Sequence, residues 1–288
     1  MSVAEIIQQV LPIAITVSLA MMVAAVGLDA GFDALISLFR QPVRLAKAVL
    51  AVNVIVPLAA VILIWLFPVP PAVRGGIVLM AVSPMSPFVP SKRVALTEDK
   101  SYGYGLYASL ALLSIVIVPL TVAILANVYE VTVPLGVLPV AKKVALSVLL
   151  PLAVGLVLRQ LLPGMARRLA LFLQRIGQLV LVLCLVPIIV VSWSAMVDLA
   201  GNGALLAMAL TSAIALTGGY WLGGPEAADR QALATTAAGR HPGLALMIAG
   251  AAGAGADKSV TAAIVAFLLV GLVVGAVYGA WAKRRAAA

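Results

Sequence analysis

Apolar runs of about 20 residues, separated by short groups of charged or helix-breaking residues, recur along this whole chain. A helix of that length spans the hydrocarbon core of a bilayer. Only 10% of the 288 residues are charged, whereas a soluble domain has about 25%. The chain lacks the short segments of alternating polarity that are typical of membrane β-strands. These features predict an all-α polytopic protein that is embedded in the lipid bilayer.

Proline, glycine and charged residues divide the chain into nine predicted membrane segments. Their approximate limits are 8–31, 43–67, 74–97, 102–127, 136–161, 171–198, 203–222, 227–253 and 258–282. Because the connections between them are short, residues 1–288 are predicted to form a single transmembrane domain.

The positions of lysine and arginine predict how these segments are oriented. Most of the 19 basic residues fall in alternate connections, starting with the first, and in the C-terminal tail. By the positive-inside rule, the N-terminus then lies outside and the C-terminus in the cytoplasm. We expect the inner (plasma) membrane of a bacterium, and no removable signal peptide, because the first residues lack a cationic region. The net charge of +9 is not concentrated in a basic domain interleaved with aromatic residues, so nucleic acid is not an expected partner.

Two of the segments cannot be continuous helices. Segment 3 contains AVSPMSPFVPSKR, with prolines at positions 84, 87 and 90, and segment 8 contains GRHPG at 239–243. A proline inside a helix removes a backbone hydrogen bond and clashes with the preceding turn. Non-helical backbone at membrane depth is tolerated only where it is buried in protein or lines a watery cavity. Both breaks are therefore predicted to lie at a functional site.

The spacing of the two breaks predicts an inverted repeat. Segments 1–4, about 8–127, pair with segments 6–9, about 171–285, and this pairing sets segment 3 against segment 8. Segment 5, about 136–161, is then a connector helix that inverts the second copy. In secondary transporters with this arrangement, the discontinuous helices cross near the midplane and build the substrate site.

Arg240 and His241, in the second break, are the first candidates for substrate-binding residues. No carboxylate lies deep in any predicted segment, so Arg240 has no obvious internal counter-ion and is a candidate ligand for an anionic substrate group. Alternatively, it caps backbone carbonyls that Pro242 frees, or reaches toward an interface. His241 is expected either to bind the anion, to carry a proton, or to bond the broken backbone.

Four further residues complete the predicted substrate site. Ser83 and Ser86 flank the first break, where free N–H groups favour an anion; alternatively, their hydroxyls bond their own unwound backbone. Thr236 lies near the second break, and it and Thr235 can equally bond back within their own helix. Asn53, four residues before Pro57, can bind substrate or bond a neighbouring helix.

The sequence gives no sign of an enzyme or a cofactor. There is no nucleophile–base constellation and no phosphate-binding glycine loop, and the single histidine and the single cysteine, Cys184, offer no metal cluster. No cofactor is expected, and no feature of the sequence predicts the oligomeric state.

Several motifs are similar to those of the bile acid:sodium symporter family. These are GLDAGFDALISLFRQP at 27–42, NVIVPLA at 53–59, SPMSPFVPSKR in segment 3 and TTAAGRHPGLAL in segment 8. The resemblance implies an inverted-repeat fold of ten helices, or nine when the first is missing.

The same resemblance marks this chain as a divergent member. Where the family supplies a Ser-Asn pair to sodium, this chain has Val89 and Pro90, and near the hydroxyl ligands of the next helix it has Gly103 and Tyr107. Ala237 matches the position of a glutamate that two sodium ions share. Sodium prefers several oxygen ligands, so sodium is a possible coupling ion whose typical ligand positions are substituted.

These observations predict a secondary active transporter of a small or amphipathic organic anion. It would work by alternating access and be coupled to sodium or to protons. The alternative is a membrane scaffold or sensor that keeps the symporter fold without transporting, which the substituted sodium positions favour.

Overall fold

The computed structural model describes residues 3–83, 100–128, 137–251 and 257–287. Within these ranges the elements are helices, and no strand is present. Six of the described helical spans are long and apolar enough to cross a membrane, and Pro71–Val82 and Ala145–Leu161 are shorter apolar helices. The prediction of an all-α membrane protein is confirmed, whereas the count of nine membrane segments remains a prediction.

The first part of the chain contains α1 to α6, and the helix limits follow the predicted segments closely. The elements are α1 (Val3–Ile36), α2 (Pro42–Val49), the π-helical turn η1 (Leu50–Ile55), α3 (Val56–Leu66), α4 (Pro71–Val82) and α6 (Lys100–Val128). The second predicted segment, 43–67, is thus interrupted by a π-helical turn. Such turns occur frequently at functional sites.

The second part of the chain contains α7 to α13. The elements are α7 (Val137–Leu161), α8 (Pro163–Val191), α9 (Trp193–Asp198), the 3₁₀ turn η2 (Leu199–Gly201), α10 (Ala204–Leu222), α11 (Ala227–Ala238), α12 (Pro242–Ala251) and α13 (Lys258–Ala287). Helix α8 begins eight residues before the predicted limit of 171. Its first residue is Pro163, and proline is favoured at the first position of a helix because its fixed φ suits the helix and its missing N–H is not needed there.

Helix α1 contains a break that the sequence analysis did not predict. Gly31 has φ 73° and ψ 162°, a conformation that is open almost only to glycine. The Arg159 side chain lies beside this residue, so that a Cβ on Gly31 would be 3.1 Å from Arg159 Nε. Helix α1 is therefore kinked at Gly31, and the Arg159 side chain of α7 packs against the kink.

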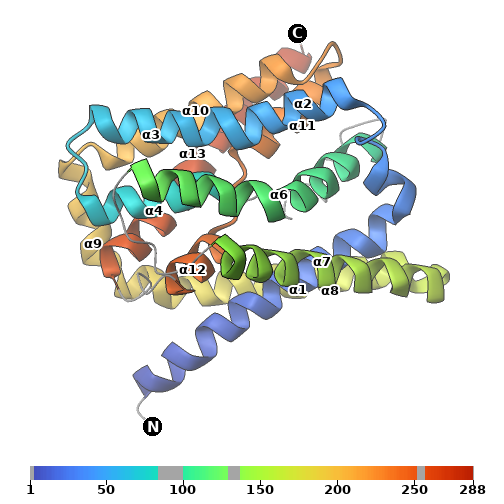
Figure 1. The fold of residues 1–288 in the computed structure, drawn as a ribbon, viewed down its shortest axis with the longest axis horizontal. Coiled ribbons are helices and arrows are strands. Elements are labelled where there is room, and N and C mark those ends of the chain that lie inside the picture. Colours follow the sequence, from blue (N-terminus) through green and yellow to red (C-terminus); the bar gives the residue numbers. More distant parts are fainter. Residues whose placement is uncertain (1–2, 84–99, 129–136, 252–256, 288) are drawn as a thin grey trace.

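The helices pack in two groups, which are defined here by their contacts. In the first group, α1 packs along both α7 and α8. In the second, α10 packs on α3, α11 and α13, and α4 packs on α13. Helix α6 contacts α1 and α7 of the first group and also α11 and α4 of the second. Figure 1 shows α1, α7 and α8 together along one side of the molecule, with α3, α10 and α11 along the other.

Many large apolar side chains point outward, as expected of a protein that is surrounded by lipid. Trp221 is 81% exposed, Leu66 is 71% exposed and Val277 is 67% exposed. In water such a surface would be unfavourable. Together with the six apolar spans, it identifies the chain as an integral membrane protein.

Candidate functional site

The predicted break in segment 8 lies between α11 and α12. Helix α11 ends at Ala238, Gly239 has φ −79° and ψ 87°, and α12 begins at Pro242. The cause is local, since Pro242 has no N–H to donate and disfavours helical backbone at the residue before it. Arg240 and His241 therefore lie between two half-helices, as the sequence predicted.

The Arg240 guanidinium crosses from this break to two other helices. Its Nη1 donates to the carbonyl of Ser83 at 3.1 Å, and its Nη2 donates to the carbonyl of Val52 at 2.6 Å. Ser83 directly follows α4 and has a non-helical ψ of 140°. The three segments 52–57, 79–83 and 238–242 are therefore brought together around one side chain.

The Val52 carbonyl is available to Arg240 because of a nearby proline. In a π-helical turn each carbonyl bonds the N–H five residues later, and for Val52 that residue is Pro57, which has no N–H. Arg240 thus caps carbonyls that Pro57 and the end of α4 leave open. The carbonyl that Pro242 frees, that of Ala238, accepts a hydrogen bond from the main-chain N–H of Arg240 at 3.1 Å, and not from its guanidinium.

Arg240 is enclosed, and none of the residues that the structure describes is an acidic partner for it. The residue is 3% exposed, and its Nε has no hydrogen-bond partner among the described residues. The ion pair found in the described part of the chain is elsewhere, between Arg44 and Asp229 at 3.4 Å. Carbonyl dipoles stabilise a guanidinium without neutralising it, so the charge of Arg240 is not compensated by the described residues around it.

His241 presents a second buried donor next to Arg240. The residue is 1% exposed, and its Nδ1 accepts a hydrogen bond from the Leu244 N–H at 3.2 Å. An imidazole nitrogen that accepts is unprotonated, so the proton of the neutral ring is on Nε2. Nε2 is buried and has no partner among the described residues. The expectation that His241 bonds the broken backbone therefore holds for Nδ1. Nε2 has no partner among the described residues and can donate to a ligand.

The remaining predicted site residues differ in their surroundings. Ser83 is fully buried, and its hydroxyl donates to the Met80 carbonyl of its own helix at 2.7 Å. Thr236 is 1% exposed. Asn53, next to Val52, has a buried Oδ1 without a partner in the described structure. Ser86 lies outside the described residues.

Two residues that position the site were not identified as site residues from the sequence. Gly243 lies against His241, so that a Cβ there would be 2.9 Å from His241 Cε1. Pro57 opens the carbonyl that holds Arg240. The sequence feature that could have identified Pro57 is its position four residues after Asn53 inside an apolar segment. The feature that could have identified Gly243 is the Pro-Gly pair that starts α12.

The fold and the site define a polytopic membrane protein in which a broken helix places polar side chains inside the helix bundle. The sequence model of the Sodium Bile acid symporter family matches residues 16–199. The match covers more than half of the chain, so this protein belongs to that family. Asn53 and Ser83 lie within the matched residues, whereas Arg240 and His241 lie beyond them. A comparison with curated proteins gave no match.

Proposed function

We propose that this protein is a secondary active transporter of a small or amphipathic organic anion and that it works by alternating access. Membership of a symporter family supports transport. The observation that carries the choice of substrate is the buried guanidinium of Arg240, which lies between two half-helices and, within the described part of the chain, is bonded only to main-chain carbonyls. A buried charge that lacks a partner costs several kcal/mol, and an anionic substrate group would remove that cost.

The donors that remain open suit such a group. Arg240 Nε–H and His241 Nε2–H are both buried without partners among the described residues, and both are hydrogen-bond donors. A carboxylate or sulfonate accepts several such bonds, and bonds to ionised groups are about twice as strong as neutral ones. Ser83, Ser86, Thr236 and Asn53 are proposed to line the same substrate site.

The pattern of helix contacts supports the proposed inverted repeat of about 8–127 and 171–285. Under this pairing α3 corresponds to α10 and α4 to the α11–α12 pair, while α6 corresponds to α13. The α3–α4 contact then corresponds to the α10–α11 contact. In the same way, the contact between α4 and α13 corresponds to the contact between α11 and α6. All four of these helix pairs are in contact. Helix α7 is the proposed connector. Transport would follow from rocking of the first helix group against the second.

The coupling ion is proposed to be sodium or a proton. The family's name points to sodium. At the position that matches the shared sodium ligand, however, this chain has Ala237, which is completely buried and offers no side-chain oxygen. We propose that the N-terminus lies outside and the C-terminus in the cytoplasm, on the basis of the basic residues.

Uptake by the purified protein in liposomes tests the proposal. A panel of labelled carboxylates and sulfonates, from small acids to amphipathic sterol acids, is offered under an imposed sodium gradient and, separately, under a pH gradient in sodium-free buffer. We expect uptake of at least one anion, and the gradient that supports it identifies the coupling ion. If no anion is taken up under either gradient and none binds, the proposed function is wrong.

The alternative function is a scaffold or sensor that keeps the fold without transporting. The alanine at position 237 favours it, since its side chain offers no oxygen ligand at a position where the family holds sodium. In that case an anion would still bind at Arg240, but the liposomes would accumulate none of it under either gradient.

A further inference from the structure

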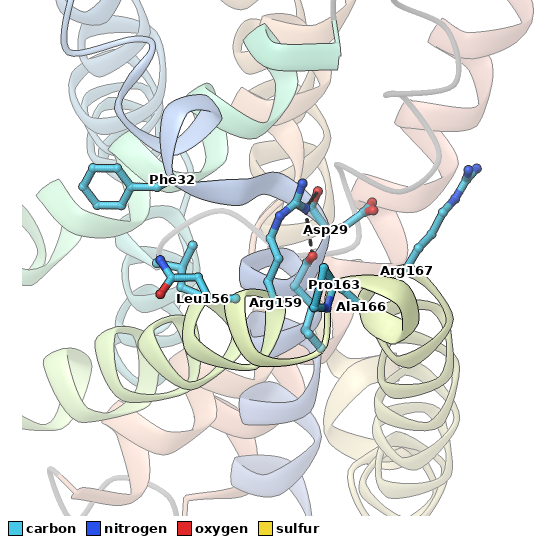
Figure 2. A pocket seen from close by; sticks show the side chains of 9 residues that line it. Asp29, Phe32, Leu156, Arg159, Pro163, Ala166 and Arg167 are labelled. Atoms are coloured by element: carbon cyan, nitrogen blue, oxygen red, sulfur yellow. Dashed lines mark hydrogen bonds between the residues drawn. The ribbon is translucent and has the colours of Figure 1, made fainter.

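A pocket of about 390 Å³ lies where α1, α7 and α8 meet, and none of the residues around Arg240 lines it. Its lining includes Asp29 and Phe32 of α1, Arg159 near the end of α7, and Arg167 in the first turns of α8. Figure 2 shows Arg159 directed toward Asp29, and Arg167 extending from α8 at the edge of the pocket. Only Leu162 separates α7 from α8, so Arg159 and Arg167 lie on either side of a very short connection.

The pocket carries more positive than negative charge. Its lining contains two arginines and one carboxylate, Asp29, and the Asp29 carboxylate already accepts a hydrogen bond from the Tyr104 hydroxyl. Arg159 uses Nη1 for the carbonyls of Leu28 and Asp29, at 2.9 Å and 2.6 Å. A guanidinium has five N–H donors, and Nε and Nη2 form no hydrogen bond with the described residues, so they can bind a ligand. The N-terminus of α8 adds the positive end of a long helix dipole.

Arg159 is held in place by the break in α1. Gly31 departs from helical geometry directly after Leu28 and Asp29, and Arg159 Nη1 donates to the carbonyls of both residues. Its guanidinium is thus fixed at the pocket by the main chain, which lowers the entropy that a ligand must overcome when it binds.

The ends of three apolar helices meet near the pocket, which is the arrangement expected at the level of the lipid headgroups. The membrane span of α1 ends at Ala34, the apolar part of α7 ends at Leu161, and the span of α8 begins at Pro163. The side chains around it are apolar and exposed: Phe32 is 62% exposed and Met165 is 59% exposed. A ligand in this position has a charged group against arginines and hydrocarbon beside it.

We propose that this pocket binds the headgroup phosphate of an anionic phospholipid. The phosphate contacts Arg159 and Arg167, and the acyl chains run along the exposed apolar side chains of α1 and α8. Basic pockets between transmembrane helices bind anionic headgroups in this way. A soluble phosphate has the same anionic chemistry, but it gains nothing from the apolar surroundings.

Thermal unfolding of the purified full-length protein in a neutral detergent tests this assignment. Phosphatidylglycerol, phosphatidylcholine and inorganic phosphate are titrated separately. We expect phosphatidylglycerol alone to raise the unfolding temperature. Arg167→Gln should bind it about fivefold more weakly, the loss typical of one basic residue near an anionic surface, and Arg167→Lys should retain most of the affinity.

Arg168→Gln is the matched control, because Arg168 is the next residue of α8 and is exposed, yet it does not line the pocket. It should bind phosphatidylglycerol as the wild type does. The proposal is overturned if phosphatidylcholine stabilises equally, if Arg167→Gln and Arg168→Gln behave alike, or if inorganic phosphate reproduces the effect, which would assign the pocket to a soluble anion. Arg167 is exposed and forms no hydrogen bond or ion pair among the described residues, so its substitution leaves the fold intact.

Discussion

Gly243 separates two side chains that belong to different parts of the molecule, the His241 ring and Ile15 of α1. A Cβ at this position would lie 2.9 Å from His241 Cε1 and 3.0 Å from Ile15 Cγ2. We therefore expect Gly243→Ala to shift the imidazole by a few tenths of an ångström. If His241 contacts the anion, this misplacement should weaken anion binding by about 3–10-fold, measured by equilibrium binding to the purified protein.

Gly250→Ala serves as the control for this substitution. Gly250 lies in the same helix, α12, and a Cβ there would meet no atom within 4 Å. It should leave the affinity for the anion unchanged. Unchanged affinity in Gly243→Ala as well would show that the position of the His241 ring is irrelevant to binding.

At the scale of single residues, the sequence predicted where the helix breaks around Arg240, but not which carbonyls its guanidinium bonds. The break at 239–243 follows from the local chemistry of glycine and proline, which a sequence shows directly. The carbonyls that hold Arg240 lie 157 and 188 residues away along the chain. They can be assigned only when the packing of α4 and η1 against the break is known.

At the scale of helices, α1 and α7 approach each other through glycine. A Cβ on Gly155 would lie 2.2 Å from the Ala24 carbonyl oxygen, and one on Gly27 would lie 2.5 Å from the Leu152 carbonyl oxygen. Small residues at such crossings let backbones pack closely in membranes. Gly155→Ala should push the two helices apart and destabilise the protein by about 1–3 kcal/mol, measured as a lower unfolding temperature in detergent.

Gly275→Ala provides the comparison, because Gly275 lies within α13 and a Cβ there would meet no atom within 4 Å. It should leave the unfolding temperature unchanged or raise it slightly, since alanine favours helix over glycine. Equal unfolding temperatures for the two variants would contradict a tightly packed crossing of α1 and α7.

The limits of most helices were predictable because charged and helix-breaking residues mark them. Segment 203–222 corresponds to Ala204–Leu222, and segment 136–161 to Val137–Leu161. The break at Gly31 and the π-helical turn at 50–55 were missed. At both places an arginine from a distant part of the chain, Arg159 or Arg240, donates to main-chain carbonyls, and the sequence does not show which segments come together there.

At the scale of the whole molecule, alternating access requires the two helix groups to move against each other. Helix α6 lies between them, and a Cβ on Gly105 of α6 would be 2.3 Å from Ser37 Oγ, just after α1. Paired cysteines at these positions are close enough for a disulfide. In a Cys184→Ala background, oxidation of Ser37→Cys/Gly105→Cys should stop anion uptake, and reduction should restore it.

Equilibrium binding of the anion should survive this cross-link, since neither residue belongs to the site around Arg240. The two single-cysteine variants, treated with the same oxidant, are the controls and should transport normally. Full uptake by protein that is completely cross-linked would show that movement of α6 relative to α1 is not needed for transport.

The most direct test of the account is the affinity of the transported anion for protein variants at Arg240. Arg240→Gln should lose at least about 30-fold in affinity for the anion, because truncating one partner of a buried charge pair costs several kcal/mol. Arg240→Lys should retain part of the affinity, because it keeps the charge. Arg74→Gln is the matched control: Arg74 also donates to a main-chain carbonyl, that of Val69 at 2.7 Å, but near the start of α4. It should bind as the wild type does. Wild-type affinity in a folded Arg240→Gln protein would contradict the central claim that Arg240 holds the anion.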